Sequence, residues 1–119
     1  MSSPQRVVVS DSTPLIYLAK VGRLGLIKEV FEKVFIPEAV FNEAVTQGNA
    51  LNISDASIIE KSIGTWILRE RVKPDVNAEY HFLDTNMRLG LGEKEALKLC
   101  KQLNAHLFIV DDKEARRVS

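Results

Sequence analysis

The chain has 119 residues, of which 45% are hydrophobic and 27% are charged, as in an ordinary globular domain. This length is enough for one domain with its own core and too short for two. Sixteen Lys and Arg balance sixteen Asp and Glu, so a nucleic-acid partner would need a local basic patch. The single cysteine, Cys100, excludes an intramolecular disulfide and a cysteine-rich zinc site, and its apolar neighbours predict a core position.

The N-terminal half alternates short buried strands with helices. We predict a strand over 7–9, helices over 14–20 and 24–33, a strand over 34–36 and a helix over 37–46 that Pro37 begins. Gly48 and Asn49 indicate a break before a helix that Ser54 or Asp55 caps and that ends at Gly64. Arg69 and Arg71 place the next strand, 66–72, at a more exposed edge of a sheet.

The C-terminal half is less regular. We predict a loop over 73–78, then a helix or an extended connection over 79–89, with the helix favoured, and a sharp break at Gly90 and Gly92. A helix over 93–103, a buried strand over 106–110 and the start of another helix over 113–118 follow. This alternation predicts a three-layer α/β/α fold with a mainly parallel central sheet. No apolar run reaches the roughly 20 residues of a membrane span and no signal peptide is evident, so we expect a cytoplasmic protein without a membrane partner.

Asp11 directly follows the first predicted strand. The crevice outside the carboxyl ends of parallel strands is where open α/β sheets bind ligands, which favours a functional role for an acid at this position. A structural interpretation is equally open: Ser12 or Thr13 caps a helix whose first position is Pro14, and Asp11 is a solvated turn residue.

Two glutamates have a helical phase that turns them towards the core. Glu43 lies three residues after Val40, and Glu93 lies three residues before Ala96. Burying an ionised carboxylate costs several kcal/mol unless it is paired or bound to a metal. Taken alone, each has a slightly favoured structural explanation, since Glu43 can lie on a helix flank in reach of solvent and Glu93 can benefit from the positive end of its helix dipole.

Considered together, the acids favour a functional site more strongly than each does alone. Asp111 and Asp112 end a strand as Asp11 does, and inward-leaning Glu43 and Glu93 can reach the same rim of the sheet. Such a crevice of carboxylates needs cations, and an all-oxygen ligand set suits Mg²⁺ or Mn²⁺. His81 and His106 lie apart from this pattern, so the residues give little support to a zinc site or a Ser-His-Asp triad, and we expect His106 to be a packed residue at a strand start. Gly90 and Gly92 do not form a phosphate-binding loop and are interpreted as a turn that gives close backbone access at Glu93.

Four segments in this order resemble the PIN-domain superfamily, and more narrowly the VapC-like proteins encoded beside small antitoxins in archaea and bacteria. They are Asp11-Ser12-Thr13-Pro14-Leu15-Ile16, Ile36-Pro37-Glu38-Ala39-Val40 with Glu43, Leu91-Gly92-Glu93-Lys94-Glu95-Ala96, and Val110-Asp111-Asp112-Lys113 with Ala115 and Arg116. The resemblance implies an α/β/α nuclease that holds Mg²⁺ or Mn²⁺ and cuts RNA, often as the toxin of a toxin–antitoxin pair. It also implies a homodimer and a small antitoxin protein as partner.

The same resemblance implies the site residues. The catalytic acids are Asp11, Glu43, Glu93 and Asp112, and the metal ligands are these four together with Asp111. Of the last pair, Asp112 better fits the usual spacing, and strand alternation lets only one of the two point directly inward. Thr13 matches a position whose hydroxyl lines the site. Family members continue for another strand and helix, so we expect a single PIN-like domain over 1–119 that is truncated at its C-terminus.

Three functions are compared on this basis. The first is metal-dependent hydrolysis of RNA by an activated water, leaving a 5′-phosphate and a 3′-hydroxyl by analogy with the family. Arg116, with Lys113 and Arg117, would then contact RNA phosphates, or simply form a solvated helix face. The second is a degenerate PIN-like domain that binds RNA or a protein without cutting, for which neutral charge and the missing segment argue. Phosphoryl transfer on Asp11 is disfavoured, since Thr13 stands where such enzymes carry a second aspartate.

Overall fold

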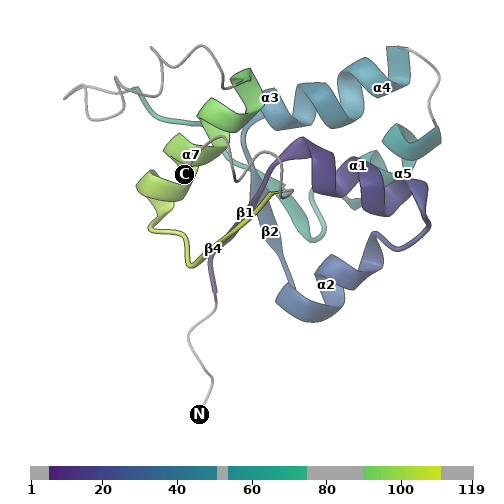
Figure 1. The fold of residues 1–119 in the computed structure, drawn as a ribbon, viewed down its shortest axis with the longest axis horizontal. Coiled ribbons are helices and arrows are strands. Elements are labelled where there is room, and N and C mark those ends of the chain that lie inside the picture. Colours follow the sequence, from purple (N-terminus) through teal and green to yellow (C-terminus); the bar gives the residue numbers. More distant parts are fainter. Residues whose placement is uncertain (1–5, 51–53, 75–89, 111–119) are drawn as a thin grey trace.

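The central sheet consists of short parallel strands. A computed structural model of the protein describes residues 6–50, 54–74 and 90–110, and in these ranges four strands pair in the order β3-β2-β1-β4. They are β1 (Val8–Ser10), β2 (Val34–Ile36), β3 (Ile67–Arg69) and β4 (Leu107–Ile109). Helices flank the sheet on both sides, which confirms the expected α/β/α class (Figure 1).

The helices connect the strands in the manner of a doubly wound fold. In chain order they are α1 (Ser12–Lys20), α2 (Gly25–Phe31), α3 (Glu38–Phe41), the π-helix η1 (Asn42–Thr46), α4 (Gln47–Ala50), α5 (Ser54–Ser62) and α7 (Leu91–Leu103). Figure 1 shows α7 on one side of the sheet and α1, α2 and α5 on the other. None of the helices in the described ranges is long and apolar enough to cross a membrane.

The core lies on both faces of the two central strands. Every residue of β1 is buried, and Val34 and Ile36 of β2 are fully buried as well. Leu15 of α1 and Leu99 of α7 belong to the same apolar cluster. Sheet positions that are apolar on both faces are typical of parallel strands covered by helices, and this pattern is why the strands could be predicted from short runs of Val, Ile and Phe.

The end of β1 lies where the strand order of the sheet reverses. From β1 the chain moves to β2 and then β3 on one side, and returns later to add β4 on the other side. Ser10 pairs with Ile109, and the Asp11 backbone N–H donates to the Ile109 carbonyl at 3.0 Å. The crevice beside such a reversal of strand order is the usual ligand site of open α/β sheets, and Asp11 stands at it.

The helical segment after β2 is longer than predicted. Pro37 caps α3 and is not its first residue, and the helical path continues through η1 into α4, so Gly48 lies inside a helix where a break was expected. A Cβ at Gly48 would lie 2.6 Å from the Ala56 Cβ of α5. Close packing between α4 and α5 therefore outweighs the low helix propensity of glycine, and the sequence-based break was wrong.

Four further expectations can be compared with the structure. Helix α7 begins at Leu91 and contains Gly92, so the sharp break predicted there reduces to the cap residue Gly90. Strand β4 is half-exposed where a buried strand was expected, since it is the last strand of the described sheet on that side. Among the strands that the structure describes, β3 lies at an edge, as predicted, and α7 ends before Asn104, which is left-handed with φ 52°. The predictions for 79–89 and 113–118 lie outside the described residues.

Candidate active site

Asp11 caps the helix that follows β1. It is the N-cap of α1 in an extended backbone conformation, and its Oδ1 accepts a hydrogen bond of 2.8 Å from the Ser12 N–H. The expectation that Ser12 or Thr13 is the cap, with Pro14 first in the helix, is therefore wrong. Asp11 is also only 1% exposed, so it is not a solvated turn residue. Its carboxylate is fixed at the buried start of a helix, where the helix dipole favours a negative charge.

Ser12 links Asp11 to the second acid. Its backbone N–H donates to Asp11, and its Oγ donates to Glu43 Oε2 at 2.9 Å from a side chain that is 4% exposed. The sequence interpretation gave Ser12 only a capping role and chose Thr13, which is half-buried in the first turn of α1, as the site hydroxyl. The signal for Ser12 was its place directly after the strand-end acid, but its partner is 31 residues away and could not be paired from one sequence.

Glu43 is carried by the π-helix η1. This five-residue segment lies between α3 and α4 without a break in the helical path. A π-helix shifts the phase of the residues that follow by accommodating an extra residue, and such segments are frequent at functional sites. Glu43 is half-buried and turned towards Ser12, which agrees with the inward lean inferred from its spacing to Val40.

Glu93 reaches the same region from α7. It lies in the first turn of this helix and is 7% exposed, so its predicted inward orientation is confirmed. Its neighbour Gly92 is in close contact with Glu43: a Cβ at Gly92 would collide with Glu43 Oε1 and lie 2.9 Å from Glu43 Cδ. Only a glycine allows this approach, which brings the Glu43 carboxylate next to the start of α7. We use the name acidic rim for Asp11, Ser12, Glu43 and Gly92, which these contacts link, together with Glu93, the next residue of α7.

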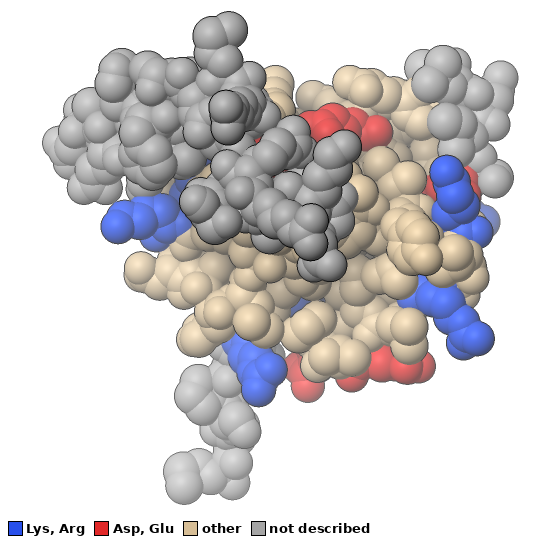
Figure 2. Space-filling view, viewed as in Figure 1, with Lys and Arg blue, Asp and Glu red and all other residues tan. Residues whose placement is uncertain are grey.

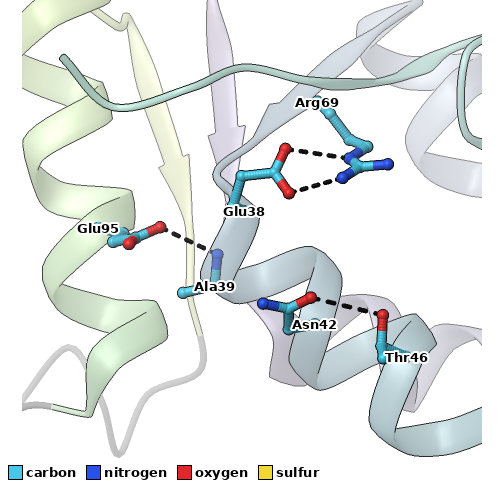
Figure 3. A network of polar contacts seen from close by, with 6 residues as sticks. All are labelled: Glu38, Ala39, Asn42, Thr46, Arg69 and Glu95. Atoms are coloured by element: carbon cyan, nitrogen blue, oxygen red, sulfur yellow. Dashed lines mark hydrogen bonds and ion pairs between the residues drawn. The ribbon is translucent and has the colours of Figure 1, made fainter.

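A second polar network fixes the start of α3 (Figure 3). Glu38 and Arg69 form two hydrogen bonds, Nε to Oε1 at 3.2 Å and Nη2 to Oε2 at 2.6 Å, and the guanidinium stacks 3.8 Å from the Phe41 ring centre. On the other side, Glu95 Oε1 of α7 accepts the Ala39 N–H at 2.9 Å. We name Glu38, Arg69, Ala39 and Glu95 the α3 clamp. It ties β3 and α7 to the helical segment that carries Glu43.

The remaining predicted site residues are not all placed. Asp111, Asp112 and Arg116 lie outside the described residues, as do Lys113 and Arg117. Within residues 6–50, 54–74 and 90–110, no three His, Cys, Asp or Glu side chains are grouped closely enough to hold a metal ion. The acids of the acidic rim nevertheless offer carboxylate oxygens, the ligands that Mg²⁺ and Mn²⁺ prefer. Their chemistry fits such an ion, although the described part of the chain does not complete its ligand set.

The histidine and cysteine that could suggest other chemistry have structural explanations. His106 is exposed, contrary to the packed position expected, and its Nδ1 accepts the Val7 N–H at 2.9 Å. Cys100 packs against the core, as predicted, and burial raises the pKa of its thiol to about 11. A thiol of this kind stays protonated near neutral pH and is a poor nucleophile.

Comparison with known proteins gives one informative result. A protein-family model described as a PIN domain matches residues 7–119. The matched range runs from β1 to the final residue and contains every acid assigned above to the site. No curated protein and no solved structure matches the chain.

Proposed function

The chain belongs to the PIN-domain family, whose members are typically nucleases, and we propose on this basis that it is an endoribonuclease that hydrolyses RNA phosphodiester bonds with Mg²⁺ or Mn²⁺. The observation that carries the proposal is that Asp11, at the end of β1, and Glu93, in the first turn of α7, are both buried. Burying a carboxylate costs several kcal/mol unless it is paired or bound to a metal, and these acids offer the oxygen ligands that Mg²⁺ and Mn²⁺ prefer.

The residues of the acidic rim would divide the work. Asp11, Glu43 and Glu93 would hold the ion together with Asp111 or Asp112, and the bound ion would supply Lewis-acid activation of water and of the phosphate. Ser12 holds the Glu43 carboxylate by its 2.9 Å hydrogen bond, and Thr13 and Arg116 would contact the RNA. The products would carry a 5′-phosphate and a 3′-hydroxyl.

The biological setting is part of the proposal. The motif resemblance supports a toxin of a toxin–antitoxin pair that acts as a homodimer in the cytoplasm, with a small antitoxin as its protein partner. Lys and Arg side chains form separate groups on the face seen in Figure 2. Balanced charge and a scattered basic surface suit an RNA held by local contacts.

A catalytically degenerate PIN domain that binds RNA or protein is the second candidate. It is favoured by one observation, that the net charge of the chain is zero and gives no overall attraction for an RNA substrate. The two candidates differ in one measurable property, since only the first cuts RNA when a divalent ion is added.

The deciding experiment is RNA cleavage by the purified protein with Mn²⁺, with Mg²⁺ and with a chelator. We expect cleavage that needs the ion, and in Asp11→Asn a loss larger than the ~10–100-fold typical of residues that only support metal ligands. Asparagine is as good an N-cap as aspartate, so the fold is retained. Glu29→Gln, at an exposed position of α2, removes the same charge and should leave cleavage unchanged. Metal-dependent cleavage that survives Asp11→Asn contradicts the assignment, and RNA binding without cleavage in the unaltered protein supports the degenerate domain.

A further inference from the structure

A pocket of about 130 Å³ adjoins the acidic rim. It lies between α1, the η1–α4 segment and α5, and its lining residues are Ile16, Glu43, Ala44, Gln47, Gly48, Asp55 and Ala56. Glu43 belongs both to this pocket and to the acidic rim. A group that enters the pocket is therefore held directly beside the place where we propose that RNA is cut.

Asp55 is the unusual member of this lining. It lies in the first turn of α5 and is 8% exposed, yet in the described part of the chain its carboxylate has neither a hydrogen bond nor an ion pair. The positive end of the α5 dipole favours the charge but satisfies few of the acceptor sites of a carboxylate. The Asp55 oxygens are not among the fully buried side-chain atoms that lack a partner in the described residues, so they are open to the pocket and can accept hydrogen bonds from a group that enters it.

The other lining residues limit which groups can enter the pocket. Ile16, Ala44 and Ala56 are apolar, and Gly48 presents bare backbone because a Cβ there would lie 2.6 Å from Ala56 Cβ. The volume is well below the ~300–1,000 Å³ of pockets that take drug-sized ligands, so a single flat group fits and a whole nucleotide does not. RNA-binding proteins take up unstacked bases in this way, with apolar contact on the faces and hydrogen bonds on the edge.

We propose that this pocket binds a guanine base of the RNA and that Asp55 recognises it. This inference rests on the proposed ribonuclease function and gives it a base preference. A carboxylate only accepts hydrogen bonds, and guanine is the one common RNA base with two adjacent N–H donors, N1–H and the 2-amino group, on its pairing edge. The Gln47 amide, also in the lining, supplies a donor for the guanine O6.

A cationic side chain from a partner protein is the competing occupant, since a guanidinium also carries paired donors. The guanine assignment is favoured because the pocket shares Glu43 with the proposed site of RNA cleavage and because its apolar lining residues can contact the faces of a base. A free phosphate is excluded, as two carboxylates in the lining would repel it.

The test measures RNA binding without cleavage, in the presence of a chelator. Fluorescently labelled pentauridine whose central base is guanine, hypoxanthine or adenine is titrated with the protein, and anisotropy gives the affinity. Hypoxanthine differs from guanine only by lacking the 2-amino group. We expect guanine to be bound about ten-fold more tightly than hypoxanthine, within the range found for a good bidentate base contact.

Asp55→Asn tests the residue. The side chain keeps its shape but loses one acceptor oxygen, so we expect the preference for guanine over hypoxanthine to fall to about two-fold or less. Glu60→Gln is the matched control, because it removes a charge from an exposed position of the same helix and should leave the preference intact. Thermal melting of both variants checks folding, and the comparison of bases in the unaltered protein does not depend on any variant.

The outcomes separate this inference from the proposed function. Equal binding of the three bases, or a guanine preference that Asp55→Asn leaves intact, overturns the inference, as does an arginine-containing peptide that binds only when Asp55 is present while guanine is not preferred. Metal-dependent cleavage without base preference would keep the nuclease and reject the pocket. Guanine-specific binding without any cleavage would support the guanine pocket and reject the nuclease function.

Discussion

The acidic rim and the α3 clamp hold carboxylates at the same end of the sheet in opposite ways. Asp11 and Glu93 of the rim are 1% and 7% exposed, whereas the Glu38 side chain of the clamp is 42% exposed and bound to Arg69. An exposed ion pair contributes only ~0–1 kcal/mol, and a buried carboxylate costs stability unless it has a partner. Buried acids at the start of two helices and an exposed acid held in an ion pair thus occur side by side.

This contrast indicates which acids take part in the proposed reaction and which orient the fold. The clamp fixes the start of α3 from two directions, through Arg69 at the end of β3 and through Glu95 on α7. Together these contacts fix the position of the helical segment that carries Glu43. In this position Glu43 contacts Ser12 and Gly92 of the acidic rim. Changes in the rim should therefore alter activity more than stability, and changes in the clamp should alter stability first.

Gly92→Ala should produce the largest separation of the two effects. The new Cβ would collide with Glu43 Oε1, which is the far end of a flexible side chain and can move away. Alanine also favours the helix by ~1 kcal/mol relative to glycine, so the free energy of unfolding should change little. Displacing a site group by about 1 Å can cost on the order of 100-fold in rate, and we expect a loss of RNA cleavage of this size.

Gly25→Ala is the control for this change. Gly25 begins α2, and a Cβ there would meet nothing within 4 Å, so cleavage should stay near that of the unaltered protein while the free energy of unfolding stays the same or rises by up to ~1 kcal/mol. Rates of RNA cleavage and urea unfolding are measured for both variants. A fully active Gly92→Ala protein would show that the contact between Gly92 and Glu43 has no role in the site.

The comparison also shows what one sequence can predict. Runs such as Val34–Ile36 and the apolar stripe of α7 were enough for the sheet and its flanking helices, because burial on both faces leaves a strong pattern. The inward lean of Glu93 followed from helical phase alone. Asp11 could be placed at the rim because the carboxyl ends of parallel strands share one edge.

Other features depend on contacts between distant residues and left no local pattern. The inward lean of Glu43 followed from its spacing to Val40, but nothing in the residues of the π-helix η1 indicated the extra residue that this segment accommodates. Gly92 was predicted to lie in a turn. It lies inside α7 instead, because the close approach of the distant residue Glu43 requires a glycine there. Asp55 was interpreted only as a cap, because its burial requires the packing of α4 against α5.

Glu95 should show an intermediate effect, since it belongs to the clamp but sits on the helix that carries Glu93. Glu95→Ala removes the acceptor of the Ala39 N–H, and losing a bond of this kind at a helix start costs about 1 kcal/mol. Glu95→Gln keeps a carbonyl acceptor and should retain most of the stability. Urea unfolding gives the free energies, and we expect cleavage by Glu95→Ala to fall less than in Gly92→Ala. Equal stability of the two Glu95 variants would remove the hydrogen bond from the explanation.

The smallest effect is expected for the exposed pair of the clamp. Glu38→Gln should lower the free energy of unfolding by less than ~1 kcal/mol, and added salt should reduce the difference because both side chains are over 40% exposed. Arg69→Ala should cost more, as it also removes the stacking over Phe41, which adds ~0.5–1 kcal/mol at exposed sites. A double-mutant cycle of the two positions, measured at low and high salt, gives the coupling. If Glu38→Gln instead abolished cleavage without changing stability, the division between an orienting clamp and a reacting rim would be wrong.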